Sequence, residues 1–152
     1  MKRRQFVKVG MTGAVLMFLE KIAQAGHYKM GAGNAKINTL VNKKSPSNLE
    51  KKHVPLVEAP KTVKKGRWFD VNVKVGFMLE HPSIPEHWID RIELHVGGKK
   101  VSEVVNLAGG ITSSNACFEI RLNKPGDTKL EAVADCNLHG TWLSEPVHIK
   151  VT

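Results

Sequence analysis

The chain alternates apolar and polar residues over short stretches, which is the period of a β-strand with one buried face. The first clear stretch begins at Arg67, and its apolar positions are Phe69, Val71, Val73 and Val75. The polar positions between them are Asp70, Asn72 and Lys74. This pattern predicts a half-buried strand over residues 67–75.

Further strands are predicted from similar patterns, separated by glycine or proline turns. They are residues 88–96, 100–105, 116–122, 129–136 and 146–152. The pair Gly97-Gly98 between the first two predicts a hairpin turn. Short strands with frequent turns, and no convincing amphipathic helix, predict an all-β fold: an immunoglobulin-like antiparallel β-sandwich of about seven strands.

The two cysteines are expected to stay apart. Residues 123–127 read as the turn of another hairpin, which would place Phe118 opposite Ala132. In that register Cys136 points to the same side as Phe118 and Cys117 points to the other side, so Cys117 is predicted to be a free thiol. A slip of one residue would reverse these directions, and a disulfide is then the alternative in an exported chain.

The first 25 residues have the pattern of an export signal. A basic start at residues 2–8 precedes a mostly apolar run at 9–19, and Ala-Gln-Ala at 23–25 resembles a cleavage site. The paired arginines near the start resemble a twin-arginine signal, which exports folded proteins. We predict a signal over residues 1–25 and a periplasmic or otherwise exported protein. A general secretory signal or an uncleaved anchor is the alternative.

Residues 26–49 are rich in Gly, Asn, Lys and Ser and show little apolar periodicity. This composition is typical of a flexible segment. We therefore predict a flexible leader over residues 26–49 and a single folded domain over residues 50–152.

The formal net charge of +9 first suggests a nucleic-acid partner. Residues 1–25 carry five basic side chains and one acidic one, a net charge of +4, which leaves +5 for the rest. The remaining lysines are scattered among acidic residues, and aromatic residues at stacking intervals are missing. The sequence therefore predicts no nucleic-acid partner. It also predicts no stable membrane insertion after the signal is cleaved, because no other segment is apolar enough to span a bilayer.

The strongest chemical signal is a cysteine three residues before a histidine. Cys136 and His139 lie in the segment Cys-Asn-Leu-His-Gly, and a soft thiolate beside an imidazole can bind one transition metal. His53, His81 and His87 lie in loops or extended segments beside prolines. Four imidazoles and one thiolate suit redox-active iron better than structural zinc, which usually closes at four ligands. The other histidines, placed in the leader or on the surface, are His27, His95 and His148.

In this order the segments resemble the iron domain of superoxide reductases of the neelaredoxin and desulfoferrodoxin family. The matching segments are residues 52–55, 80–94 and 136–142. The resemblance covers most of residues 50–152, without a preceding cysteine-rich domain, as in the one-iron form of the family. It implies one iron (Fe2+/Fe3+) per chain. The implied ligands are the four equatorial imidazoles of His53, His81, His87 and His139, and the axial thiolate of Cys136 opposite an open position.

The resemblance also implies a reaction, in which superoxide takes up one electron and two protons to give hydrogen peroxide. Lys52 matches the family's lysine that attracts superoxide and assists protonation. The glutamate often found just before that lysine is replaced by Lys51, so either Glu50 reaches the ferric iron or the iron keeps a water or an open position. Backbone N–H groups of Asn137 and Leu138 are expected to point toward the Cys136 sulfur.

The expected partners are superoxide and an electron-donor protein of unknown identity. One-iron relatives commonly form tetramers, so a homo-oligomer is expected, with a tetramer as one form it could take.

Two other functions stay open. A non-enzymatic exported sandwich, resembling the sulfur-carrier partner subunits of thiosulfate-oxidation systems, would match residues 69–130 but leaves His53 and residues 136–140 unexplained. A zinc or copper module using part of the ligand set is the third reading.

Overall fold

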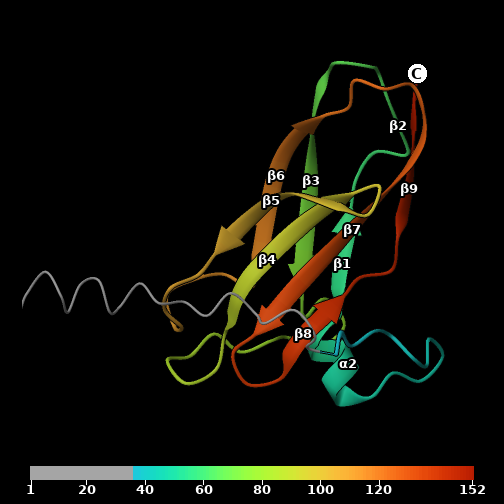
Figure 1. Ribbon diagram of the computed structural model, residues 1–152. Helices are drawn as coiled ribbons and strands as arrows, with labels where there is room; N and C mark the ends of the chain where they lie inside the picture. The colour runs from blue at the N-terminus through green and yellow to red at the C-terminus, as the bar shows by residue number, and fades with distance from the viewer. Residues whose placement is uncertain (1–35) are drawn as a thin grey trace, which may run out of the picture. The chain divides into compact units, whose positions relative to one another are not determined.

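The computed structural model describes residues 36–152. This part of the chain contains one short helix and nine strands (Figure 1). In chain order they are α2 (Asn48–His53), β1 (Pro55–Glu58), β2 (Thr62–Val63), β3 (Trp68–Val75), β4 (Ile89–Val96), β5 (Lys99–Val105), β6 (Asn115–Arg121), β7 (Gly126–Cys136), β8 (Gly140–Leu143) and β9 (Val147–Val151).

The strands form two sheets. The smaller sheet has the order β1-β3-β6, and the larger has the order β2-β9-β7-β4-β5, with β8 paired to β7. All pairs of named strands are antiparallel except β2 and β9, which are parallel. The all-β prediction is confirmed.

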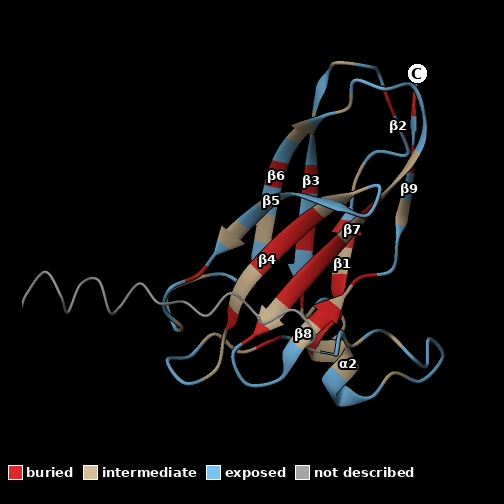
Figure 2. Ribbon diagram, viewed as in Figure 1, coloured by how far each residue is buried: buried red, intermediate tan, exposed pale blue. Residues whose placement is uncertain are grey.

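The core lies between the two sheets. On β3, residues Val71, Val73 and Val75 are buried while the residues between them are exposed, as the alternation predicts. They join one apolar cluster with Ile92 of β4 and Leu130 of β7, which are fully buried. Figure 2 shows that buried residues concentrate on β4 and β7, the middle strands of the larger sheet. Burial of this apolar surface supplies the main driving force for folding.

The turn predicted at Gly97-Gly98 is confirmed. It joins β4 to β5, which pair antiparallel, and both glycines have positive φ angles of 56° and 81°. Two consecutive residues with positive φ match the twist of a tight hairpin, and glycine adopts this conformation without a steric penalty.

The second predicted hairpin is wrong. Strand β6 pairs with β3, and Phe118 lies opposite Val71, whereas β7 pairs with β4, β8 and β9. Residues 123–125 therefore connect the two sheets. Alternation shows which face of a strand is apolar, but either sheet can supply the partner strand. The cysteines are still unpaired: Cys117 is exposed on β6 and Cys136 is buried on β7.

The sequence patterns did not predict the short helix α2. Ser47 caps α2: its hydroxyl accepts the backbone N–H of Glu50 at 3.2 Å, and the Glu50 carboxylate accepts the backbone N–H of Ser47 at 2.7 Å. This reciprocal pair satisfies N–H groups at the start of a helix. The helix ends at His53 because Val54 is extended and precedes Pro55. Six residues are too few to show a clear helical period.

Residues ahead of α2 contact the sandwich. The backbone N–H of Asn38 donates to the carbonyl of Thr141 at 2.9 Å, and the N–H of Leu143 donates to the carbonyl of Asn38 at 2.9 Å. The predicted domain start near residue 50 falls inside α2. The predicted signal at residues 1–25, and the leader as far as residue 35, lie outside the described residues. Among the helices in residues 36–152, none has the length and apolar character needed to cross a membrane.

Candidate metal centre

Three separate segments carry the predicted ligands to one end of the sandwich. His53 is the last residue of α2, and His81 and His87 lie in the connection from β3 to β4. Cys136 is the last residue of β7, and His139 lies in the turn between β7 and β8. Figure 1 shows α2, β8 and the β3–β4 connection at the same end of the two sheets.

Gly76, directly after β3, allows the backbone of His81 to lie close to this strand. Gly76 has a φ of 83°, and a Cβ atom at this position would lie 2.5 Å from the backbone nitrogen of His81. Any larger residue would therefore push the His81 segment away in addition to straining its own backbone.

Four of the five side chains form one tight group. Each of His53, His87, Cys136 and His139 offers a ligand atom, and these atoms all lie within 4.8 Å of one another. The Nε2 atom of His87 lies 3.2 Å from the Cys136 sulfur and 3.2 Å from the Nδ1 atom of His139. This Nδ1 atom lies 3.6 Å from the same sulfur. The arrangement matches a set of donors that converge on one small ion.

His81 lies beside this group and completes a ring of four imidazoles. Its ring centroid is 4.7 Å from that of His53 and 4.6 Å from that of His87. His139 likewise lies 4.8 Å from both. The order around the ring is therefore His53, His81, His87, His139, with His53 and His87 across from each other at 6.0 Å. We call these four side chains the imidazole ring.

The two buried histidines have one nitrogen engaged and one nitrogen without a partner. The Nδ1 atoms of His53 and His81 lie 2.7 Å from the backbone carbonyls of Leu49 and Pro82. This contact fixes the tautomer with the proton on Nδ1, which leaves a lone pair on Nε2. Within residues 36–152 both Nε2 atoms are buried without a hydrogen-bond partner. A buried unsatisfied polar atom costs about 1–3 kcal/mol, and a metal bond removes that cost. These residues therefore fit a bound metal.

The protonation states also suit metal binding. Burial lowers the pKa of His53 and of His81 to about 4, so both are neutral at pH 7. Burial is also the largest cause of the lowered pKa of His87. Burial raises the pKa of the Cys136 thiol, although backbone N–H groups of Leu138 and His139 partly oppose this. A metal that binds here would displace the thiol proton.

Of the two N–H groups predicted to point toward the Cys136 sulfur, that of Leu138 does so and that of Asn137 does not. The N–H groups that point to the Cys136 sulfur are those of Leu138 and His139. The N–H of Asn137 instead donates to the carbonyl of Trp88 at 3.3 Å. Asn137 directly follows β7, and its backbone continues the pairing with the start of β4, which leaves its N–H unavailable to the sulfur.

The side chain of Asn137 holds the segment that carries His87. Its Oδ1 accepts the N–H of Trp88 at 2.9 Å, and its Nδ2 donates to the carbonyl of Glu86 at 2.9 Å. These two bonds lie on either side of His87 in the chain. Asn137 therefore connects the Cys136 turn to the His87 loop.

Sequence reasoning did not identify Trp142 as part of this centre. Its ring stacks on His53 with centroids 5.1 Å apart and planes at 23°. Its Nε1–H donates to the backbone carbonyl of His139 at 3.0 Å. Trp142 is buried and thus contacts two members of the imidazole ring. Its position within the family-like block 136–142 was the only signal for it.

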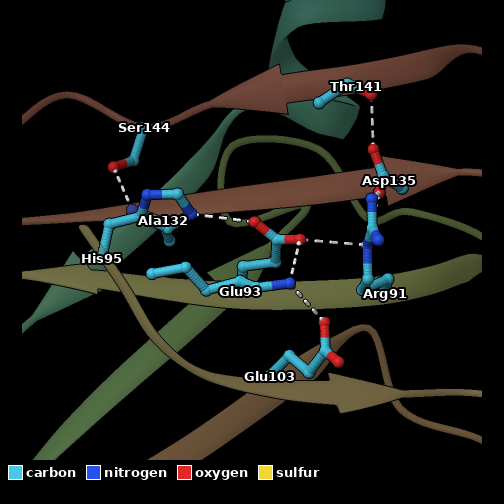
Figure 3. A network of polar contacts seen from close by, with 9 residues as sticks. Arg91, Glu93, His95, Glu103, Ala132, Asp135, Thr141 and Ser144 are labelled. Atoms are coloured by element: carbon cyan, nitrogen blue, oxygen red, sulfur yellow. Dashed lines mark hydrogen bonds and ion pairs between the residues drawn. The ribbon is translucent and has the colours of Figure 1, made fainter. Parts of the chain in front are cut away.

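A polar network supports the hairpin that carries Cys136 (Figure 3). Asp135 accepts the hydroxyl of Thr141 across the β7–β8 pair and accepts the Nε–H of Arg91 from β4 at 2.7 Å. On the same sheet, Glu93 lies 2.8 Å from the Nε2 atom of His95. His95, which was predicted to be a surface residue, is half-buried and pairs with this buried glutamate.

Glu50 and Lys52 have different surroundings although both lie on α2. The Glu50 carboxylate accepts backbone N–H groups of Val41 and Ser47, each at 2.7 Å, and these bonds lower its pKa to about 2. Both donors therefore lie at or before the start of α2. The charge of Lys52 contributes to the lowered pKa values of His53 and His87, after burial and the effect of His139. Lys52 is thus the lysine whose field acts on the imidazole ring.

Comparison with known proteins agrees with this arrangement. The desulfoferrodoxin family model matches residues 45–145, which include all five side chains. The chain belongs to the desulfoferrodoxin family.

Two of the similar curated proteins are named superoxide reductase. The superoxide reductase of Pyrococcus horikoshii is 37% identical over 103 residues, which is 62% of this chain and 84% of the relative. That of Thermococcus kodakarensis is 35% identical over 102 residues, with the same coverage. Among solved structures, the superoxide reductase (neelaredoxin) of Ignicoccus hospitalis superposes with a TM-score of 0.65 at 31% identity, covering 76% of this chain and 95% of that one.

We predict that Asn137→Ala lowers the affinity for iron by about tenfold, because it removes both side-chain bonds beside His87. Competition with a chelator measures the affinity. Asn72→Ala, on the exposed face of β3, is the matched control and should bind iron like the wild-type protein. Equal affinities for the two variants would contradict a positioning role for Asn137.

Proposed function

We propose that this protein is a superoxide reductase that holds one iron per chain between His53, His81, His87, His139 and Cys136. The observation that carries the proposal is the convergence of four imidazoles and one cysteine sulfur at one end of the sandwich. The superoxide reductase names of the two relatives and of the similar solved structure support it.

The reaction adds one electron and two protons to superoxide and yields hydrogen peroxide. Iron held by these five residues would supply the electron, and a donor protein would replace that electron. The chain supplies four neutral donors and one anionic donor, so the Cys136 thiolate neutralises only part of the metal's charge. The remaining positive charge attracts an anionic substrate.

The exposure of the five side chains indicates the side from which superoxide reaches the centre. His53, His81 and Cys136 are buried, whereas His87 is half-buried and His139 is exposed. Solvent and a small anion therefore approach from the side of His87 and His139. The positive charge of Lys52 acts on His53 and on His87. In the proposed function Lys52 attracts superoxide and orders the water that delivers protons.

The sulfur-carrier alternative gives no role to the convergence of His53 and Cys136. A zinc or copper module would use the same donors, so metal analysis separates it from the proposal. About one iron per chain in anaerobically purified protein supports a superoxide reductase, whereas copper or zinc supports the module and no metal supports the carrier.

Replacing the only anionic donor tests the centre directly. We predict that oxidised wild-type protein shows a thiolate-to-iron charge-transfer band, that Cys136→Ser lacks it, and that superoxide reduction falls by about 100-fold or more in the variant. Absorption spectroscopy and stopped-flow mixing with superoxide give the two readouts. Cys117→Ser is the matched control, because this thiol is exposed on β6 and should leave both unchanged. A band that survives in Cys136→Ser would contradict the proposal.

We predict that Lys52→Ala lowers the second-order rate of superoxide reduction by about tenfold at low ionic strength, because it removes a positive charge that acts on His53 and His87. The difference should shrink as salt rises, since screening weakens the attraction. Lys51→Ala removes the same charge one residue earlier and serves as the control. A similar loss in both variants would show that only net charge matters.

Glu50→Ala should leave the ferric spectrum and the rate of superoxide reduction unchanged within about twofold, because the carboxylate is bound at the start of α2. The variant should instead be less stable. A carboxylate with a depressed pKa stabilises the fold above its unfolded pKa, so the stability difference should disappear as the pH falls from 4.5 through about 2. Unfolding in urea at several pH values measures it. A loss of activity comparable to that of Cys136→Ser would contradict this reading.

The N-terminal pattern supports export by the twin-arginine route to the periplasm. Fractionation and N-terminal sequencing of the mature protein test this, and a cytoplasmic protein that begins at Met1 would overturn it. A homo-oligomer, tested by light scattering, is proposed from the one-iron resemblance.

A further inference from the structure

The connection from β5 to β6, residues 106–114, packs on the loop that carries His87. Gly109 makes the closest approach: a Cβ atom at this position would lie 2.0 Å from the carbonyl oxygen of Ile84 and 2.9 Å from a ring carbon of Trp88. Both distances are shorter than van der Waals contact. Gly109 does not have a positive φ, so the small size of glycine is what this position requires.

Ile84 and His87 form a tight turn that presents the His87 ring. The backbone N–H of each residue donates to the carbonyl of the other at 3.0 Å. The oxygen that Gly109 approaches is therefore the acceptor of the His87 N–H. A side chain at position 109 would push this oxygen away and move the backbone of a proposed metal ligand.

Side-chain hydrogen bonds hold the β5–β6 connection against both sides of this turn. The Ser83 hydroxyl donates to the carbonyl of Thr112 at 2.7 Å and accepts the N–H of Gly110 at 3.2 Å. On the other side of the turn, the Trp88 indole N–H donates to the carbonyl of Asn106 at 3.1 Å. The turn is thus held from before and after the ligand that it carries.

Asn106 fixes the β5–β6 connection to the larger sheet. Its buried side-chain amide donates to the carbonyl of Ile89 at 2.8 Å and to that of Ser113 at 3.1 Å. Ile89 is the first residue of β4 and lies opposite Cys136 on β7. The connection therefore places the His87 turn relative to the strand that ends in the cysteine ligand.

His87 depends on this support more than the two buried histidines do. The Nδ1 atoms of His53 and His81 lie 2.7 Å from backbone carbonyls, whereas the His87 ring has no carbonyl partner within residues 36–152. Its ring contacts Cys136 and His139, which are proposed ligands themselves. His87 is also only half-buried. Its position is therefore set mainly through its backbone.

We propose that Gly109 is a positioning residue for the metal centre, because its missing side chain lets the β5–β6 connection hold the His87 turn against Cys136 and His139. Gly109 contacts neither the metal nor superoxide and acts through the Ile84 carbonyl. This inference rests on the proposed function, because the position of His87 matters only if its ring binds the metal.

The test compares Gly109→Ala with Gly98→Ala. Each variant adds one methyl group, but a Cβ atom at Gly98 would have no atom within 4 Å. Gly98 follows the end of β4 that lies away from Cys136. Its φ of 81° makes alanine strained there, so Gly98→Ala should lower stability without reaching the centre. It therefore separates a general loss of stability from displacement of His87.

Hydrogen exchange in the metal-free protein measures the turn directly. We expect the His87 N–H to exchange at least about tenfold faster in Gly109→Ala, because the displaced Ile84 carbonyl no longer accepts it. Gly98→Ala should leave this exchange within about twofold of wild type. The same protection of the His87 N–H in Gly109→Ala as in wild type would overturn the proposal.

Titration with Co²⁺ then measures the effect on the centre. Co²⁺ accepts the same nitrogen and sulfur donors, and its visible absorption bands change with their arrangement. We expect Gly109→Ala to bind Co²⁺ about tenfold more weakly and with shifted bands, and Gly98→Ala to match wild type. Wild-type affinity and bands in Gly109→Ala, or an equal loss in both variants, would count against a positioning role.

Ser83→Ala keeps the test decisive if Gly109→Ala does not fold. It removes the hydroxyl that ties the turn to residues 110 and 112 and adds no atom. We expect about threefold weaker Co²⁺ binding and faster exchange of the His87 N–H. If both measurements equal those of wild type, the β5–β6 connection does not position His87.

The positioning role and the proposed function fail in different ways. Wild-type protein that binds Co²⁺ with the expected dependence on Gly109, but does not reduce superoxide when loaded with iron, contradicts the proposed function alone. Active wild-type protein whose metal affinity is unchanged by Gly109→Ala contradicts the positioning role alone.

Discussion

The metal centre depends on the convergence of five side chains at one end of the sandwich, two of which have a nitrogen without a hydrogen-bond partner within residues 36–152. The Nε2 atoms of His53 and His81 are buried and unpaired, and the sulfur of Cys136 is buried beside them. This burial keeps these two imidazoles neutral and the thiol protonated until a metal takes the proton's place. Iron binding and the packing of α2 against β8 are therefore expected to stabilise each other.

The sheets hold this arrangement by joining the three ligand segments to one another. Asn137 links the Cys136 turn to the His87 loop, and Trp142 links β8 to the helix that ends in His53. Asp135 ties β7 to Arg91 of β4 and to Thr141 of β8. Because these contacts join the three segments, a substitution in one segment should also shift the ligands that the other segments supply.

The fold could be predicted as far as local patterns extend. Alternation identified β3 and its buried valines, and Gly97-Gly98 identified the turn between β4 and β5, since both signals involve residues close in sequence. The pairing of β6 with β3 could not be predicted, because an apolar strand face fits either sheet. The helix at residues 48–53 was missed because it is one and a half turns long and is stabilised by its cap.

For the centre, the sequence by itself determined the residue types: a thiolate and an imidazole three positions apart, and three further histidines held beside prolines. Their chemistry already points to one redox metal, because donor softness is a property of the side chain. Tertiary structure alone decided the order of the imidazole ring, the N–H groups that reach the sulfur, the engagement of Glu50 at its helix start and the contact of Trp142 with His53. Each of these depends on atoms that come together only when the two sheets pack.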